Sequence, residues 1–324
     1  MALQRAGVLI IGGGLIGSSI AWRLAQTGAR VTVIDAGNLG GEASSAGAGM
    51  LAPGSEVVKK SPWLDLGVES LRLYPAFLEE LKTETGMGVE FRVCGSLALD
   101  AAEPAEELLA LYRDAGVRAV PQADGLFFPD EAIVDPVALW RSLRNAGEKL
   151  GVRVEHQQIL EVETRDHEAV VIAAGAWSGD LKVTQAGRTV ALAPSEPVKG
   201  HLIGFQMRPG LLGPFLRRNQ TYVLQRSDGL VIAGATEEHV GFDTSVQTSA
   251  CDELHRRAAD VVPELAAAAP VRRWIGFRPG PENPDGPVMR RVEGTNVWMA
   301  YGHYRNGILL TPVTARRIAQ EISS

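Results

Sequence analysis

Two arginines stand in surroundings that favour ligand binding over solvation. Arg278 lies in the stretch "GFRPG", and Arg305 lies in "GHYRNGILLTP", between Gly302 and Gly307. A planar guanidinium holds a carboxylate with two parallel hydrogen bonds, which a lysine ammonium cannot do. The glycines would let the backbone pass close to a flat ligand. The alternatives are a surface salt bridge for Arg278 and an exposed loop for Arg305. The apolar, glycine and proline neighbours of the two residues favour an anion-binding site.

The stretch "VLIIGGGLIGSSIAWRLAQTGARVTVIDAG" has the pattern of a dinucleotide-binding site. The apolar run Val8–Ile11 predicts a buried strand, and Gly12, Gly14 and Gly17 follow in the spacing G-x-G-x-x-G. In that order, these glycines permit a tight turn, the approach of a pyrophosphate, and close packing of a helix on the strand. A second strand ends on Asp35, where an acid bonds ribose hydroxyls. The free N–H groups at the start of the helix favour phosphate.

The segment "GGEASSAGAGMLAP", residues 40–53, indicates which dinucleotide is bound. It is small, flexible and polar, so its backbone N–H groups can follow a longer cofactor, the pyrophosphate and flavin of FAD. Met50 and Leu51 have little use in an exposed linker, which is the alternative interpretation. We therefore expect FAD rather than a nicotinamide cofactor.

Composition and charge exclude several classes of protein. The chain has 324 residues, of which 45% are hydrophobic and 22% charged, and a net charge of −6, so we expect no nucleic-acid partner. Cys94 and Cys251 stand alone, and the six histidines follow no metal-ligand spacing, so we expect reduced thiols and no metal. No stretch is long and apolar enough for a membrane span. We expect a cytoplasmic protein, and a homo-oligomer remains open.

The remaining segments predict an α/β fold with two interleaved domains. The stretch "AVVIAAGAWS", residues 169–178, predicts a buried parallel strand that ends in a turn at Gly175 beneath the cofactor. The stretches "KGHLIGF", "TYVLQR", "LVIAGAT" and "RRWIGFRPG" predict a mainly antiparallel sheet with one helix. The sequence therefore predicts a Rossmann-like FAD-binding domain and a second, α+β domain, with a small-ligand cleft between them. The first takes residues 1–80, 130–190 and 281–324, and the second takes 81–129 and 191–280.

Together these segments resemble the D-amino-acid oxidase family of flavoproteins, and within it the glycine oxidases linked to thiamine biosynthesis. The resemblance covers nearly the whole chain and is carried by the N-terminal fingerprint, "SSAGAGMLAP", "VVIAAGAWS", "PVKG", "GATEE", "GFRPG" and "GHYRNGILLTP". It implies non-covalent FAD and oxidative deamination of glycine or a similar small amino acid, with O2 reduced to H2O2. The alternatives are a sarcosine oxidase or D-amino-acid dehydrogenase of the same fold, a flavin-dependent nucleic-acid-modifying enzyme, and a non-catalytic flavin-binding module.

The resemblance also implies roles for single residues. Arg278 and Tyr222 hold the substrate carboxylate, Arg305 approaches the substrate from the other side, and Met50 lies at the flavin end. Taken alone, Tyr222 suits a core position equally well. The implied cofactor contacts, which include the three fingerprint glycines, are Gly12, Gly14, Leu15, Ile16, Gly17, Asp35, Ala36, Ala43, Ser44, Ala48, Gly49, Met50, Ile159, Gly175, His303, Tyr304, Arg305, Asn306, Gly307, Ile308 and Leu309.

Three features depart from the family pattern. The connection 162–169 is very short where the family carries an extra β excursion, which bears on the adenine contact at Ile159. Gln220 stands where some relatives have a polar aromatic residue. Glu237 and Glu238 place acids near a position that can be apolar. The preferred amine substituent therefore stays open among glycine, sarcosine and small D-amino acids.

Overall fold

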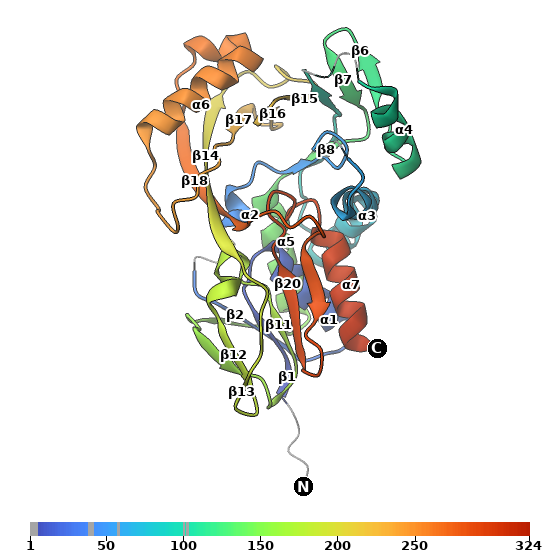
Figure 1. Cartoon of the computed structure of the whole chain (residues 1–324), viewed down its shortest axis with the longest axis vertical. Helices are drawn as coiled ribbons and strands as arrows, with labels where there is room; N and C mark the ends of the chain where they lie inside the picture. Colours follow the sequence, from blue (N-terminus) through green and yellow to red (C-terminus); the bar gives the residue numbers. More distant parts are fainter. Residues whose placement is uncertain (1–5, 38–41, 57–58, 100, 102–103) are drawn as a thin grey trace.

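The protein has two halves, each built on its own β-sheet (Figure 1). The computed structural model describes residues 6–37, 42–56, 59–99, 101 and 104–324. A six-stranded sheet fills the lower half of Figure 1, and an eight-stranded sheet with the helix α6 fills the upper half. The mixed α/β class expected from the sequence is confirmed.

The six-stranded sheet is parallel except at one edge, where β19 pairs antiparallel with β20. In spatial order its strands are β19 (Val288–Arg291), β20 (Val297–Tyr301), β11 (His167–Ile172), β1 (Ala6–Ile11), β2 (Val31–Asp35) and β9 (Arg153–His156). Along β1, Val8 and Ile10 pack beneath the helices α1 (Leu15–Gln26) and α7 (Thr311–Ser323), and Leu9 and Ile11 pack on the opposite face. Both faces are thus covered, which explains the continuous apolar run.

On that opposite face packs a small three-stranded sheet. It contains β10 (Glu161–Glu163), β12 (Lys182–Gln185) and β13 (Arg188–Thr189). Residues 164–166 alone connect β10 to β11, and Asn296 braces this turn by donating to the carbonyl of Thr164 at 2.8 Å. The 3-10 helix η1 (Gly175–Asp180) then leads from β11 towards β12.

The turn between β1 and α1 leaves no room for side chains at two of its glycines. Gly12 has a φ of +107°, a left-handed conformation that other residues adopt only with strain. A Cβ at Gly17 would lie 1.8 Å from the carbonyl oxygen of Gly12. The predicted tight turn and close helix packing are therefore confirmed.

Two helices and a second small sheet pack with α1 in one apolar cluster. The helices are α3 (Pro62–Thr85) and α5 (Pro136–Lys149), and the sheet contains β3 (Met50–Leu51), β8 (Ala132–Val134) and β4 (Phe91–Val93). Asp135 caps α5 by accepting hydrogen bonds from the N–H groups of Val137 at 2.8 Å and Ala138 at 3.0 Å. Residues 40–53 were expected to be a flexible segment. Within them, the described part forms the short helix α2 (Ala43–Ala46) and β3, while residues 40 and 41 lie outside the described residues.

The eight-stranded sheet is antiparallel apart from the pairing of β15 with β5. In spatial order its strands are β18 (Arg272–Gly280), β14 (Glu196–Gln206), β17 (Leu230–Gly234), β16 (Thr221–Gln225), β15 (Phe215–Arg218), β5 (Ser96–Ala98), β7 (Gly125–Phe128) and β6 (Val120–Gln122). The helix α6 (Thr248–Val261), followed by the short η2 (Pro263–Ala267), packs on one face, and α4 (Glu106–Ala115) lies at the β6 end. Because side chains alternate along a strand, Val223 faces α6 while Tyr222 and Leu224 face the other way.

The predicted division into two domains stays a prediction. Every strand of the six-stranded sheet falls in the segments 1–80, 130–190 and 281–324, and every strand of the eight-stranded sheet falls in 81–129 and 191–280. The boundary placed at residue 80 lies inside α3. Among the described helices, none is both long and apolar enough to cross a bilayer. In the same part of the chain, no cluster of three or more His, Cys, Asp or Glu residues is placed to hold a metal ion.

We predict that Gly17→Ala destabilises the protein by about 3 kcal/mol or more, because the carbonyl of Gly12 cannot move without breaking the turn. Gly88→Ala is the matched control, since Gly88 has open space around it. It should change the stability by less than about 1 kcal/mol. Urea unfolding of both variants measures the difference, and equal stabilities would refute the steric argument.

Candidate functional site

A single long cavity of about 640 Å³ joins the two halves of the protein. One end lies beside Asp35 and the stretch 157–160, at the carboxyl ends of β1 and β2. The other end is lined by Tyr222 and Arg278 from the eight-stranded sheet. The carboxyl ends of parallel strands are where α/β proteins bind ligands. The volume is within the range of cofactor-binding pockets, about 300–1,000 Å³.

At the first end, hydrogen bonds hold the glycine turn against its neighbours. The N–H of Gly13 donates to Asp35 Oδ2 at 2.6 Å, and the N–H of Leu15 donates to Ser44 Oγ at 2.9 Å. Asp35 therefore closes β2 beside the start of α1, as the sequence predicted. Gly14 is the cap residue of α1 and has no side chain to block that helix end. The arrangement leaves a helix N-terminus facing the cavity, which favours an anion.

In the middle of the cavity, a buried arginine fixes the segment 48–50. The guanidinium of Arg226 donates to the carbonyl of Val134 at 2.6 Å and also to that of Ala48. Burial lowers the pKa of Arg226. Gly49 has a φ of +91°, and a Cβ there would lie 2.0 Å from the carbonyl oxygen of Val134. Sequence reasoning missed Arg226, because nothing in "QRSDG" points to residues so far away in the chain.

The loop 303–308 forms another wall. The His303 ring forms a hydrogen bond with Thr314 Oγ1 at 2.9 Å. Burial lowers the pKa of His303 to about 3, so its imidazole is neutral, and one ring nitrogen is already bonded to Thr314. Tyr304 has a φ of 47°, and its N–H donates to the carbonyl of Pro279 at 3.1 Å. This bond ties the loop to β18, at the residue that directly follows Arg278.

At the far end, glycines make room for Tyr222 and Arg278. The tyrosine ring lies over Gly234, its partner across the strand pair, where a Cβ would sit 2.3 Å from the hydroxyl. The guanidinium of Arg278 lies over Gly200 of β14, where a Cβ would sit 2.6 Å from Nη2. Burial raises the pKa of Tyr222, so its phenol stays protonated and can donate. Burial and the nearby charge of Arg305 lower the pKa of Arg278.

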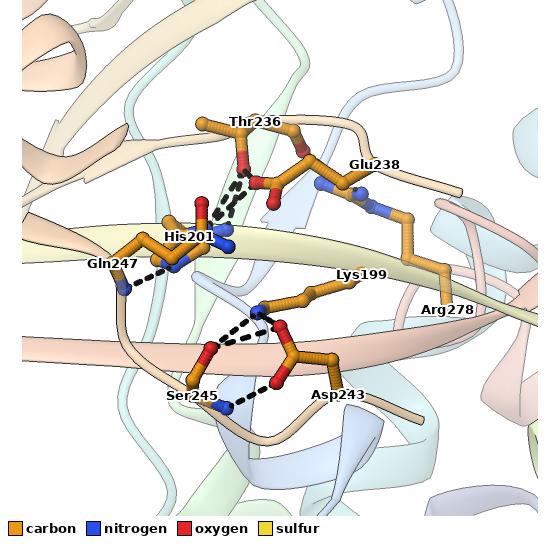
Figure 2. A network of polar contacts seen from close by, with 8 residues as sticks. All are labelled: Lys199, His201, Thr236, Glu238, Asp243, Ser245, Gln247 and Arg278. Carbon is orange, nitrogen blue, oxygen red and sulfur yellow. Dashed lines mark hydrogen bonds and ion pairs between the residues drawn. The ribbon is translucent and has the colours of Figure 1, made fainter. Parts of the chain in front are cut away.

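Figure 2 shows a polar network behind Arg278. The ammonium of Lys199 is buried and lies 2.7 Å from Asp243 Oδ2. Asp243 in turn accepts hydrogen bonds from both the N–H and the hydroxyl of Ser245. A buried ammonium needs such a partner, so this pair holds the loop after β17 against β14.

The imidazole of His201 completes the network. Its Nε2 accepts from the N–H of Gln247 at 3.0 Å, so the proton is on Nδ1, which lies 2.7 Å from Glu238 Oε1. Thr236 Oγ1 accepts from the N–H of His201 at 2.8 Å. The carbonyl of Thr236 accepts from Arg278 Nη1 at 3.1 Å. The network therefore fixes the Thr236 carbonyl, which orients the Arg278 guanidinium (Figure 2).

Sequence reasoning also missed a carboxylate in the cavity wall. Glu56 has a side chain only 10% exposed, with Oε1 3.1 Å from Arg217 Nη2 and Oε2 3.4 Å from Arg305 Nε. Burial alone would raise the pKa of Glu56, but the guanidiniums of Arg217, Arg305 and Arg278 together hold it below its ordinary value. Its partners are distant in sequence, so a single glutamate after a small-residue segment gave no signal.

Comparisons with known proteins agree with this geometry. The family model described as FAD dependent oxidoreductase, DAO, matches residues 7–321. The chain belongs to the DAO family. A glycine oxidase of Pseudomonas putida is 32% identical, with 95% of this chain and 92% of that protein covered. The solved structure of a glycine oxidase from Geobacillus kaustophilus superposes with a TM-score of 0.87 at 30% identity, over 99% of this chain and 95% of the other.

A third relative, the "Bifunctional protein ThiO/ThiG" of Synechocystis sp., is 34% identical over 97% of this chain. This chain spans about half of that protein's length, 51%. The match therefore concerns one part of a larger protein.

As a member of the DAO family, the protein uses FAD, and the cavity fits this cofactor. The start of α1 and the bare backbone at Gly14 suit the pyrophosphate, and Asp35 suits a ribose. The small residues from Ala43 to Gly49 leave the middle of the cavity open. Non-covalent attachment and each single contact remain predictions.

The structure brings almost all predicted site residues to the cavity wall. The exceptions are Gly17, which packs beneath the turn, and Leu309, which lies in the core between α3 and α7. Ile159 lines the wall despite the short connection that follows it. Gln220 is exposed and does not line the cavity. The two neighbouring acids have different partners: Glu238 binds His201, and Glu237 lies near Arg305.

We predict that His303 makes the folded state sensitive to acid. Its pKa falls from an ordinary 6.5 to about 3 on folding, so between these values the unfolded chain binds a proton that the folded chain does not. Stability is therefore full above pH 6.5 and is lost as the pH falls, by about 1.4 kcal/mol per unit.

His303→Gln keeps a polar partner for Thr314 but cannot titrate. The loss of unfolding free energy between pH 7 and pH 5, measured with urea, should be smaller by about 2 kcal/mol in this variant. His156→Gln, at an exposed position on β9, is the control and should keep the wild-type loss. The same loss in His303→Gln as in wild type would contradict the assignment.

Proposed function

We propose that this protein catalyses the FAD-dependent oxidative deamination of glycine and similar small amino acids, with O2 as electron acceptor. The supporting observation is the state of Arg278. Its guanidinium is largely buried at the end of the cavity, and within the described residues its one hydrogen-bond acceptor is the carbonyl of Thr236. No described carboxylate forms an ion pair with it. A buried cation without a counter-charge is costly, so the site favours an anionic ligand.

An amino-acid carboxylate suits this position. The fork of Arg278 has donors left for two parallel hydrogen bonds, and the protonated phenol of Tyr222 can add a third. Gly200 and Gly234 bring both side chains flat against the sheet, so the space above them is kept for a small ligand. These contacts would fix the substrate by its carboxylate and direct its Cα along the cavity.

When bound, FAD would supply the two-electron acceptor for the hydride of the substrate Cα–H, with O2 as the final electron acceptor and H2O2 as the product. The resulting imine is hydrolysed by water to glyoxylate and ammonia. Neither His303 nor Glu56, which both line the cavity, is suited to act as a base. His303 is neutral and bonded to Thr314, and Glu56 is held by ion pairs that lower its pKa. The substrate amine therefore loses its proton to solvent before the reaction.

A role in thiamine biosynthesis is part of the proposal. Its support is the match of nearly the whole chain to one half of the "Bifunctional protein ThiO/ThiG". Growth of a glycine-oxidase-deficient, thiamine-requiring strain on supply of this chain would test the role, and failure of an active enzyme to restore growth would contradict it.

Arg278→Ala should weaken glycine binding by a factor of about thirty to several thousand, since truncating one partner of a buried charge pair costs about 2–5 kcal/mol. Arg278→Lys should recover part of this loss, because an ammonium cannot reproduce the fork. Anaerobic flavin reduction over a glycine series, measured by stopped flow, gives the dissociation constant.

Arg273→Ala is the matched control for this experiment. It removes an exposed arginine from the same strand, β18, and should leave glycine affinity unchanged. FAD content should equal that of wild type in all three variants. Unchanged glycine affinity in Arg278→Ala would overturn the assignment of the carboxylate site.

A further inference from the structure

A second arginine at the substrate end is already neutralised by the protein. Arg305 Nε lies 3.4 Å from Glu56 Oε2, and Arg305 Nη1 lies 3.8 Å from Glu237 Oε2. Its side chain is 20% exposed, and it lines the cavity together with Glu56 and Arg278. The two arginines of the site therefore differ, since Arg278 has no carboxylate partner among the described residues and Arg305 has two.

The position of Glu56 is fixed by the backbone that precedes it. The N–H groups of Gly54 and Ser55 both donate to Glu131 Oε1 at 2.8 Å. The guanidinium of Arg217 donates to the carbonyl of Ser55 and also pairs with the Glu56 carboxylate. The backbone before Glu56 is therefore held by Glu131 and Arg217, and Arg217 also holds the Glu56 carboxylate beside Arg305.

The charges of this cluster leave room for one anion. Arg305 is paired with Glu56 and Glu237, and Glu56 is also paired with Arg217. Among the described residues Arg278 has no carboxylate partner, so it is the unpaired cation of this cavity wall. A substrate with one carboxylate supplies that partner, whereas a second carboxylate would face the acids that already pair with Arg305.

We propose that Glu56 and Glu237 select substrates with a single acidic group by neutralising Arg305. The proposal rests on the proposed function, in which Arg278 binds the substrate carboxylate. Arg305 lines the same cavity as Arg278 and its charge acts on Arg278, so the second carboxylate of a diacid bound at Arg278 would lie towards Arg305. There it must either displace Glu56 or lie beside it, and like charges placed side by side repel.

Binding of unreactive acids tests this without turnover. Acetate and malonate differ by one carboxylate, and the visible absorbance of the FAD-loaded protein reports their dissociation constants. We expect wild type to bind malonate no more tightly than acetate. Glu56→Gln should shift the ratio of the two constants in favour of malonate by at least about tenfold, because Arg305 then has a free donor.

Glu237→Gln should shift the same ratio in the same direction by a smaller factor. Its carboxylate is more exposed, at 31%, and lies farther from Arg305. Glu253→Gln is the control, since it removes one negative charge from an exposed position on α6. It should leave the ratio unchanged.

Sarcosine and iminodiacetate provide the matching pair of reactive substrates, since they differ by one carboxylate on the N-methyl group. The ratio of kcat/KM for iminodiacetate to that for sarcosine should rise at least about tenfold in Glu56→Gln. An unchanged malonate-to-acetate ratio in both variants would overturn the proposal. Weaker sarcosine binding with that ratio unchanged would assign Glu56 to the substrate ammonium instead.

Two other results, a Glu56→Gln variant that does not fold and a wild-type flavin that no amino acid reduces, have separate consequences. If Glu56→Gln does not fold, the ratio in Glu237→Gln decides the question, since that variant leaves the pair between Glu56 and Arg217 intact. If no amino acid reduces the wild-type flavin, the proposed function fails. The acetate and malonate constants still test the selection for one acidic group.

Discussion

The buried guanidinium of Arg278 is the constraint around which the substrate end is arranged. Gly200 gives it a surface to lie on, the carbonyl of Thr236 orients it, and the described residues offer it no carboxylate. The network of Lys199 and His201 holds the loop that carries this carbonyl. A buried cation without a counter-charge lowers the stability of the folded protein, and an anionic ligand offsets this cost. The architecture of the upper sheet is in this way linked to ligand binding.

The cavity depends equally on the way in which the two sheets meet. The lower sheet presents the carboxyl ends of its parallel strands, and the upper sheet presents the face that is not covered by α6. Between them, Arg226 joins the segment at Ala48 to the strand ending at Val134. The proposed cofactor and substrate sites thus share one continuous cavity wall.

The sequence predicted those features that local sterics and spacing determine. Gly12 and Gly17 are required by a turn within six residues, and their pattern can be read directly. Arg278 was singled out by its glycine and proline neighbours, whereas Tyr222 and the shared carboxylate role were predicted through the family resemblance. Glu56 and Arg226 were not predicted, because their function comes from partners that are adjacent only after folding, such as Arg226 and Ala48, which are 178 positions apart. The short connection before β11 was visible in the sequence, but the small sheet of β10, β12 and β13 was not.

The central claim is that one cavity holds FAD and a small amino acid in reactive contact. Anaerobic addition of glycine to the purified yellow protein tests it most directly. The account predicts that the visible flavin absorbance bleaches, that it returns when O2 is admitted, and that glyoxylate and H2O2 form in equal amounts. A protein that releases FAD on acid treatment but keeps an unchanged spectrum with glycine, sarcosine and D-alanine would contradict the account.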